Sequence, residues 1–464
     1  MRIPQSLAVL TLLTLTSGAC LPNSTSSTAL QAALTQGGAG YVLSLCPNEV
    51  YDLSQPLAFA SPDQEISTEG YPAGSARAVL RVVGGTSAVS GTRAGLDGAR
   101  LRYVQVDGNR GALPPATGAA AIEMGGNNAN QLIEHVRSYD ARAWSCLHVA
   151  EGDLRCTNTT VQYCDVGPCG QADFGAWADG ISLSCRDSAV QFNTVTDATD
   201  GGVVVFGAPG SVVRNNTIQA VTRPMLGGIN LVDVVPWVPG NYTHTQVLDN
   251  AISGGFGDAA SAAGALVKVG IAIGPRVWFG DKYGANVSTG GVVRGNVLRG
   301  AFSFGIAVAS ADSFVVADNS FAGEVAFIGD IGPNCTQGAL APHPPTALLA
   351  DLATLTNVTL TPGISPTPAD DFAFVNGTAS ALTCFIPPKA AAWPAGQGVP
   401  AVSPVDTGAS QTPTSAPRTT PSNSTATASA HSTATVNSAA RAIAHSNCLT
   451  IAHLLLITAT LFIN

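Results

Sequence analysis

VQFNTV at residues 190–195 and VRNNTI at 213–218 are copies of one short pattern, in which Val precedes Asn by three residues and an apolar residue follows two residues later. The pattern returns as VLDNAI at 247–252, VRGNVL at 293–298 and VADNSF at 316–321. An earlier copy, VQYCDV at 161–166, has Cys164 in the Asn position, and IEHVRS at 133–138 is a looser copy. Repeats of this kind are typical of solenoid proteins, in which each unit packs on its neighbours.

A second motif alternates with the first and consists of glycine, an apolar residue, any residue and another apolar residue. Its copies are GISL at 180–183, GVVV at 202–205, GINL at 228–231, GIAI at 270–273 and GIAV at 305–308. Alternation with a period of two is typical of β-strands that bury one face. We therefore predict an all-β solenoid, a parallel β-helix in which each coil has one strand from each motif and a short third strand after the Asn.

The repeated Asn residues suit a structural role in such a coil. The intervals from Asn193 to Asn216 and from Asn296 to Asn319 are both 23 residues. Asn tolerates the left-handed backbone that a sharp bend between strands requires, and stacked Asn side chains can hydrogen-bond from coil to coil. We therefore interpret these Asn residues as structural rather than catalytic.

Composition divides the chain into segments. Residues 1–19 contain Arg2, an apolar run and small residues up to Ala19, as in a signal peptide. The expected order after it is an N-terminal cap with the first coils at 20–119, regular coils at 120–330, a C-terminal cap region at 331–400 and a disordered Ser/Thr/Pro-rich stalk at 401–437.

Residues 438–464 end in an uncharged apolar tail that is short for a bilayer span. Small residues and a polar spacer precede the tail, which suits a signal for a glycolipid (GPI) anchor attached near Asn437 or Ser438 and removal of the tail. A short membrane anchor that is retained is the alternative. Nine Asn-x-Ser/Thr sequons agree with secretion. We expect an extracellular glycoprotein, GPI-anchored at the cell surface or secreted, that meets the membrane only through its lipid.

Cysteine spacing agrees with an extracellular location. Eight cysteines remain if Cys20 is trimmed or unused and Cys448 leaves with the tail, and an even number in a secreted chain favours disulfides. Cys156 and Cys185 each lie five residues before the Val of a repeat, which places them about 4.8 Å apart on adjacent coils. We predict a Cys156–Cys185 disulfide and, as a second pair, Cys335–Cys384.

With these motifs over residues 120–330, the chain resembles the right-handed parallel β-helix, or pectin lyase-like, superfamily, and within it the secreted fungal members. Known members include pectate and pectin lyases, polygalacturonases and sugar epimerases. The resemblance implies a single-stranded right-handed parallel β-helix and a polysaccharide or cell-wall glycan as partner. A fold of this kind supports several reactions, so it does not set the chemistry.

Two aspartates match part of the polygalacturonase pattern. The resemblance places Asp179, in WADGISL, at the Asp of the family's NTD motif, and Asp200, in TDGGVVVF, at the first Asp of its DD motif. Gly201 replaces the second Asp, and the GHG and RIK motifs have no counterpart. Two carboxyls on neighbouring coils could act as acid and base on a glycosidic bond. Asp-Gly is also common in turns, so a purely structural role stays open.

The outward residue of the second motif forms a stripe across the coils. In chain order the stripe contains Glu123, His148, Ser182, Val204, Asn230, Ala272 and Ala307. His148, beside Glu123 and Ser182, is a candidate for proton transfer, although an exposed histidine without a role is the alternative. Because the stripe becomes small and apolar after Asn230, we expect any site over the early and middle coils.

Long insertions beside this strand carry aromatic residues. They are Phe174, Trp177, Trp237, Tyr242, Trp278, Phe279 and Tyr283. Aromatic faces suit the apolar faces of sugars, so Trp177, Trp237 and Trp278, with Ser182 and Asn230, are candidate substrate-binding residues. The same aromatic residues fit small cores that hold the loops down, and both interpretations stay open.

Charge limits the partners. Eight acidic residues lie between Glu151 and Asp200, and they suit either Ca²⁺ or a solvated acidic surface. We expect no other cofactor and no dedicated metal site. The net charge of −9 argues against nucleic acid. Two functions remain: a polysaccharide hydrolase or lyase with Asp179, Asp200 and His148 as catalytic residues, or a non-catalytic structural or adhesion protein of a cell wall.

Overall fold

The computed structural model describes residues 20–171, 176–255, 267–279, 283–327 and 346–368. The signal peptide, the stalk, the anchor residues Asn437 and Ser438, and the pair Cys335 and Cys384 lie outside these ranges. The sequence predictions that concern them therefore stay predictions. Within the described part of the chain, no helix is long and apolar enough to cross a bilayer.

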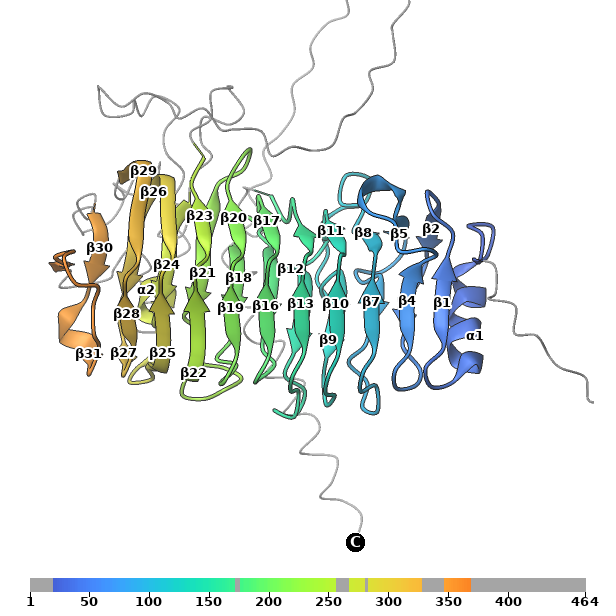
Figure 1. Cartoon of the computed structure of the whole chain (residues 1–464), viewed down its shortest axis with the longest axis horizontal. Coiled ribbons are helices and arrows are strands. Elements are labelled where there is room, and N and C mark those ends of the chain that lie inside the picture. The colour runs from blue at the N-terminus through green and yellow to red at the C-terminus, as the bar shows by residue number, and fades with distance from the viewer. Residues whose placement is uncertain (1–19, 172–175, 256–266, 280–282, 328–345, 369–464) are drawn as a thin grey trace, which may run out of the picture. The chain divides into compact units, whose positions relative to one another are not determined.

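The strands that carry the Val-x-x-Asn motif form the first of three parallel runs (Figure 1). This run contains β1 (Val42–Leu45), β4 (Glu65–Thr68), β7 (Arg100–Arg102), β10 (Leu132–Glu134), β13 (Thr160–Gln162), β16 (Ala189–Gln191), β19 (Val212–Arg214), β22 (Asn241–Leu248), β25 (Ser288–Arg294), β27 (Ala311–Asp312), β28 (Val315–Ala317) and β31 (Leu355–Thr356). Coils therefore begin well before residue 120.

A second run consists mostly of the short strands after the Asn position. It contains β2 (Val50–Leu53), β5 (Ala78–Val82), β8 (Val104–Asp107), β11 (Arg137–Tyr139), β14 (Asp165–Val166), β17 (Thr194–Thr196), β20 (Thr217–Gln219), β23 (Ala251–Ser253), β26 (Val297–Val308) and β29 (Ser320–Phe327). The third short strand of each coil, predicted from the repeats, is thus present.

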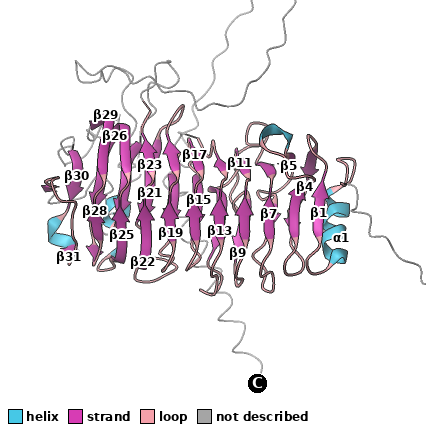
Figure 2. Cartoon of the chain, viewed as in Figure 1, coloured by secondary structure: helices cyan, strands magenta, loops and turns pink. Residues whose placement is uncertain are grey.

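The strands of the glycine motif form the third run, and this run carries the residues of the candidate site. It contains β3 (Leu57–Ala58), β6 (Val89–Ser90), β9 (Ile122–Gly125), β12 (Ser145–Ala150), β15 (Asp179–Leu183), β18 (Gly201–Val205), β21 (Met225–Leu231), β24 (Val267–Ile273), the second half of β26, β30 (Thr346–Ala350) and β32 (Thr367–Pro368). Because β26 pairs in both runs, the second and third runs form one continuous sheet. Almost every described element is a strand (Figure 2), so the chain has the parallel β-helix fold.

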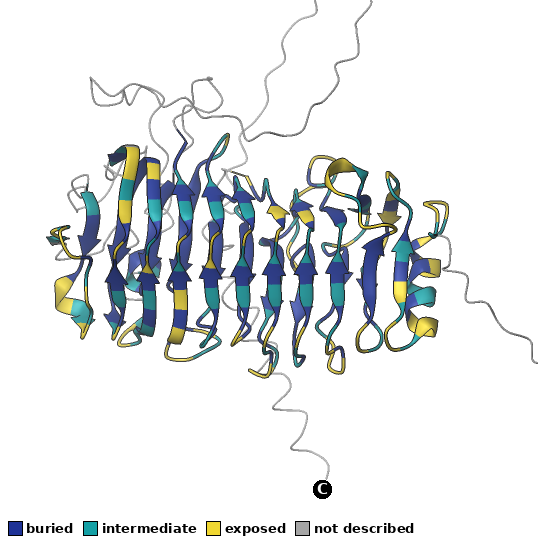
Figure 3. Ribbon diagram, viewed as in Figure 1, coloured by how far each residue is buried: buried dark blue, intermediate teal, exposed yellow. Residues whose placement is uncertain are grey.

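Identical apolar residues stack in the interior. Val161 pairs with Val190, and Val190 pairs with Val213, so the Val that begins each motif lies directly on the Val of the next coil. These side chains are fully buried, and buried residues recur along the strands from one coil to the next (Figure 3). Stacking equal residues at equal positions gives a continuous apolar core, which is the main source of stability in a solenoid.

A helix covers the first coil. Leu30 and Leu34 of α1 (Ser27–Gly37) are buried in the same apolar cluster as Leu43 of β1 (Figure 1). The Ser26 side chain accepts a hydrogen bond from the Ala29 backbone N–H at the start of α1, and Gly38, with φ of 72°, follows its end. The helix therefore shields the apolar end of the solenoid from water.

Glycine in the third run is required by close approach between coils. A Cβ on Gly180 would lie 2.6 Å from the carbonyl oxygen of Gly202, and a Cβ on Gly228 would lie 2.4 Å from that of Gly270. Both distances are too short for any side chain. The glycine motif is thus a packing requirement rather than a turn signal.

The motif Asn residues form a buried ladder, as predicted. The ladder runs along the bend between the first and second runs of strands, which is the first bend of each coil. The Nδ2 of Asn193 donates to Oδ1 of Asn216 at 3.0 Å, and the same oxygen accepts the Asn193 backbone N–H at 3.0 Å. Both bonds recur from Asn216 to Asn250, from Asn250 to Asn296 and from Asn296 to Asn319. Each Nδ2 also donates to a carbonyl of the preceding coil, such as Val190 for Asn216.

The left-handed residue of this bend is not the Asn, which corrects the sequence interpretation. It is the residue before it, and these residues are Phe192, Asn215, Asp249, Gly295 and Asp318, with φ values of 53° to 70°. The Asn side chain must point into the coil to reach both neighbouring coils. The bend is therefore made by the preceding, outward-facing position.

Three disulfides join described residues. Cys156 and Cys185 are bonded as predicted, with their Cα atoms 4.9 Å apart, and Cys146 is bonded to Cys169. The expectation that Cys20 is trimmed or unused is wrong, because Cys20 is bonded to Cys46. The parallel bridge between Leu21 and Leu45 brings these two cysteines together.

Cys164 is the free cysteine of the described residues, although the even count suggested pairing. It occupies the Asn position of its coil, and its backbone N–H donates to Oδ1 of Asn193 at 2.9 Å. Burial raises the pKa of its thiol to about 12. Cys164 therefore begins the Asn ladder as a structural residue and is a poor nucleophile.

We expect Asn216→Ala to lower the free energy of unfolding by roughly 2 to 4 kcal/mol. The substitution removes the acceptor of the Asn193 backbone N–H and Nδ2 and the donor to the Val190 carbonyl, and all three groups are buried. Urea denaturation followed by circular dichroism measures this change. The control is Asp249→Gly, which keeps the left-handed bend at an exposed position of the adjacent coil and should change stability by about 0.5 kcal/mol or less. Equal losses in the two variants would contradict a stabilising role for the ladder.

Candidate functional site

The outward stripe is in register, as the repeats predicted. His148 lies between Glu123 and Ser182 on neighbouring strands, and Val204 lies between Ser182 and Asn230. Beyond Asn230 the row continues through Ala272, Ala307 and Leu349. These three belong to an apolar cluster that includes Val277 and Trp278 of α2 (Arg276–Phe279). The stripe is therefore covered over the late coils, and its polar residues lie on the coils from β9 to β21.

Asp179 starts β15 and is held by two hydrogen bonds. Its side chain is buried, with the residue 4% exposed. Oδ2 accepts a hydrogen bond from the Ser182 hydroxyl at 2.8 Å, and Oδ1 accepts one from the Gly201 backbone N–H at 3.2 Å. Ser182 Oγ also lies 2.8 Å from Ser145 Oγ, so the carboxyl is the end of a short buried hydroxyl chain.

Gly201, where the resemblance expects a second Asp, has no room for a side chain. A Cβ there would lie 2.3 Å from the Val204 side chain and 2.9 Å from Nδ2 of Asn230. The space that a carboxylate would need is thus taken by neighbours on the same sheet. The site therefore depends on two aspartates rather than three.

Asp200 immediately precedes β18 and is half-buried. Its backbone N–H donates to the Ala178 carbonyl at 3.1 Å, which places it on the coil next to Asp179. Burial raises the pKa of Asp200 to about 6. Burial raises the pKa of Asp179 well above its usual range, and the charge of Asp200 raises it further. The hydrogen bond from Ser182 lowers this pKa but does not cancel the rise. Two neighbouring carboxyls that resist ionising together are the usual basis of an acid and base pair.

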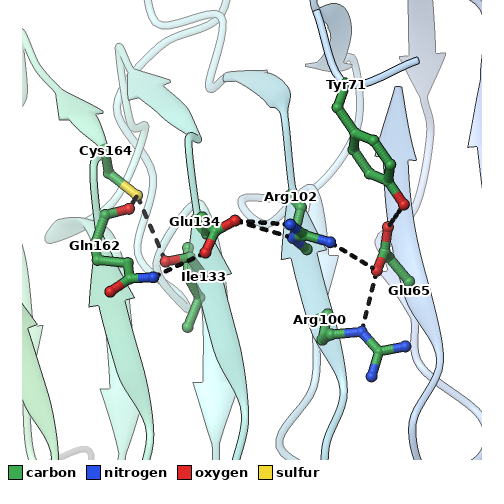
Figure 4. Close-up of polar contacts among 8 residues, drawn as sticks. All are labelled: Glu65, Tyr71, Arg100, Arg102, Ile133, Glu134, Gln162 and Cys164. Carbon is green, nitrogen blue, oxygen red and sulfur yellow. Dashed lines mark hydrogen bonds and ion pairs between the residues drawn. The ribbon is translucent and has the colours of Figure 1, made fainter. Parts of the chain in front are cut away.

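Glu65 and Glu134 of the first run have the opposite pKa shift (Figure 4). Glu65 is buried, which alone would raise its pKa, but hydrogen bonds from Tyr71, Ser67 and Arg100 and the charge of Arg102 lower it overall. Arg102 also donates to Glu134 at 2.8 Å, and its hydrogen bond helps to lower the Glu134 pKa against burial. These glutamates are neutralised structural ions, whereas the charged neighbours of Asp179 include the carboxyls of Asp200 and Asp233.

His148 has a different serine partner from the one its row suggested. Its Nδ1 lies 2.8 Å from Oε2 of Glu123, and its Nε2 lies 3.4 Å from Oγ of Ser184 rather than near Ser182. Burial lowers the pKa of His148, but the charge of Glu123, its hydrogen bond and the charge of Glu151 together outweigh burial, and the net shift is upward. The Trp144 ring packs edge-on against the imidazole at 4.8 Å between centroids. Glu123 thus favours the charged imidazolium.

The aromatic candidates divide into two groups. Trp237 is half-buried and donates from Nε1 to the Ser184 carbonyl at 2.7 Å, beside His148. Trp177 is half-buried at the base of a hairpin closed by a bridge to Gly170, and it packs on the α2 cluster. Trp144 and Phe206 were not predicted, yet they pack against each other beside His148. Their positions next to strand ends of the third run are the signal that could have found them.

Trp278 and Asn230 do not line an open surface, which corrects their assignment to a sugar-binding face. Trp278 is 4% exposed and its Nε1 donates to Oδ1 of Asn230 at 3.2 Å. Tyr242 is fully buried and donates from its hydroxyl to the Val205 carbonyl at 2.8 Å. These residues hold insertions against the sheet, the second of the two interpretations left open by the sequence.

The arrangement of possible metal ligands does not form a metal site in the described part of the chain. Among the described residues, no three His, Cys, Asp or Glu side chains converge as a metal site would require. Many of the acidic residues between Glu151 and Asp200 have local partners, as in the hydrogen bond from Asn127 to Asp153. The two interpretations of this acidic excess, Ca²⁺ binding and a solvated surface, both stay open.

Because Asp200 has a raised pKa, stability should depend on pH. The folded state keeps a proton between pH 4 and about 6 that the unfolded chain releases, so the free energy of unfolding falls as pH rises through this window. We expect a shallower fall in Asp200→Asn, measured by urea denaturation from pH 4 to 7. Asp249→Asn, at an exposed left-handed bend, is the control and should keep the slope of the native chain. An unchanged slope in Asp200→Asn would contradict this account.

No family model and no curated protein matches the chain. Among solved structures, an alginate lyase from Paenibacillus sp. str. FPU-7 is similar over 65% of this chain and 95% of its own, with 15% identity and a TM-score of 0.44. A mannuronic acid specific polysaccharide family 6 lyase from human gut microbiota is similar over 74% and 82%, with 12% identity and a TM-score of 0.44. DFA-IIIase from Arthrobacter chlorophenolicus A6 is similar over 69% and 84%, with 14% identity and a TM-score of 0.40.

Likeness at these identities concerns the fold and leaves the reaction open. The pairing of strands within this chain establishes the fold independently, through the registers of the three parallel runs. The chain is a parallel β-helix, as its repeats predicted.

Proposed function

We propose that this protein binds and cleaves a polysaccharide on the outer face of the third run, with Asp179 and Asp200 as the proton-exchanging pair. The observation that carries the proposal is the raised pKa of both carboxyls on adjacent coils. Glycosidic cleavage needs one carboxyl that keeps its proton beside another that has lost it. Glu65 shows the contrasting case of a paired structural carboxylate, whose pKa is lowered by hydrogen bonds and cations. Asp140 has a pKa raised by burial, but it is not next to a second carboxyl with a raised pKa.

The roles of the two aspartates follow from their environments. Asp179 is buried, and its pKa is raised well above its usual range, so it suits the acid that donates a proton to the leaving oxygen. Asp200 is half-buried with a pKa of about 6, so near neutral pH it is mostly ionised and suits the base or nucleophile. Ser182 orients Asp179 by donating to Oδ2.

Charge favours a neutral glycan over an acidic one. Asp179, Asp200 and Asp233 interact electrostatically, and Glu123 and Glu151 both act on nearby His148. An anionic polymer would be repelled from these carboxyls unless a cation intervened. Trp237 and Trp177 are half-buried, as Trp144 and Phe206 are, and so remain partly accessible for the apolar face of a sugar.

The proposed setting is extracellular, with the chain secreted or held at the surface by a glycolipid. Three disulfides among the described residues support an oxidising compartment. The signal peptide and the anchor signal are features of the sequence alone. A rigid, non-catalytic wall or adhesion protein is the alternative, favoured by the absence of the GHG and RIK motifs.

We expect the purified chain to release new reducing ends from at least one neutral polysaccharide in a panel that also contains acidic polymers. Asp200→Asn should lower the rate by roughly 100-fold or more, as removal of a general acid or base does. Reducing-sugar assay and mass spectrometry of the products measure this.

Asp249→Asn is the matched control, since it makes the same chemical change at an exposed bend of the first run and should retain full activity. Binding to a glycan without any product would reject catalysis and support the adhesion protein. Cleavage that persists in Asp200→Asn would reject the assigned pair.

A further inference from the structure

A ladder of five aromatic rings runs along the outside of the first bend, away from the candidate site. It consists of Tyr71, Tyr103, His135, Tyr163 and Phe192, one ring per coil, with neighbouring centroids 4.5 to 5.3 Å apart. The last two rings are nearly parallel, with 8° between their planes. Tyr163 is 47% exposed and Phe192 is 41% exposed, so the ladder lies in contact with solvent.

Every ring of the ladder is on a left-handed residue, with φ between 49° and 57°. This backbone is unfavourable for large side chains, and the following coils use Asn, Asp or Gly at the same position. Inside the ladder, stacking of neighbouring rings offsets the free-energy cost of this left-handed backbone. Phe192 is the last ring, and among the described residues only Tyr163 stacks on it, so its second face meets the next coil without a ring.

The residue at that next position is Asn215. Gln191 pairs with Arg214, so Phe192 and Asn215 occupy equivalent positions on adjacent coils, and the Phe192 backbone N–H donates to the Arg214 carbonyl. Asn215 is exposed and left-handed, and it begins the sequon Asn215-Asn216-Thr217. Its side-chain amide makes no hydrogen bond to the residues that the structure describes. An attached sugar would therefore begin beside the open face of Phe192.

We propose that Asn215 is N-glycosylated and that its first N-acetylglucosamine packs its apolar C–H face on Phe192, as a sixth layer of the aromatic ladder. Adjacent coils are about 4.8 Å apart, close to the separation that a sugar ring and an aromatic ring adopt in contact. The ring face carries partial negative charge, which attracts the C–H groups of the sugar. The glycan thus shields the last ring of the ladder from water. This inference needs passage through the secretory pathway but no catalytic activity.

Asn158 provides an internal control. It is also an exposed, left-handed sequon residue, but its neighbours on adjacent coils are Asn130 and Asp187, and neither is aromatic. Its Nδ2 donates to Oδ1 of Asn130 at 2.6 Å. A sugar at Asn158 has no ring to pack on, so any general effect of glycosylation should appear there without the stacking effect.

The test uses the full chain made in a eukaryotic secretory host. Peptide mapping by mass spectrometry should find Asn215 occupied. Asn215→Gly, which keeps the left-handed bend as Gly295 does and adds no charge beside Asp249, should lower the melting temperature by roughly 1 to 3 °C relative to the glycosylated chain. In a Phe192→Gly background, which removes the ring without adding a charge, the same substitution should have no effect, and in Phe192→Tyr the full effect should return.

Each other outcome overturns the inference in a recognisable way. An empty Asn215 beside an occupied Asn158 rejects the modification while leaving secretion intact. Empty sequons throughout reject both the modification and the secretory route. An occupied Asn215 whose loss has the same effect with and without the Phe192 ring, or the same effect as loss of the Asn158 sugar, rejects the stacking.

Discussion

Hydrogen bonding from coil to coil through buried amides is the constraint on which the rest of the structure depends. Each ladder Asn supplies an oxygen to the coil before it and receives one from the coil after it, so no copy is satisfied alone. A buried amide without partners costs more than a hydrogen bond contributes, so coils can stack in only one register. That register also aligns the core valines and brings Cys156 to Cys185.

The same register decides the chemistry of the outer face. It places Asp179 one coil from Asp200, and it stacks Ser145 beside Asp179 with its hydroxyl on Ser182. The close packing of Asn230 against Gly201 excludes a third carboxylate. What remains is a pair of carboxyls in a poorly hydrated place, which explains why both pKa values rise. Around Glu65, one face of the first run instead carries arginines at equivalent positions, and the pKa falls.

The two proposed roles, polysaccharide cleavage and packing of an attached sugar, therefore belong to different surfaces of the solenoid. The third run carries the proposed polysaccharide site, bounded on one side by the apolar cluster around α2. The first bend carries the aromatic ladder, whose strained backbone is compensated by stacking. Since a glycan at Asn215 would lie along this bend, the proposed sugar cover and the proposed reaction do not compete for the same strands.

The sequence by itself determined the coil, because side-chain periodicity is local and repeats with the backbone. Val, Asn, Gly and Cys at fixed offsets were enough to predict the ladder, the outward stripe and one disulfide. Tertiary structure alone decided which outward residues stay accessible, because the insertions that cover the sheet follow no period: Trp278 and Asn230 are buried together, and His148 meets Ser184 rather than Ser182. It also moved the left-handed bend from Asn193 to Phe192, since only an inward Asn can reach both neighbouring coils.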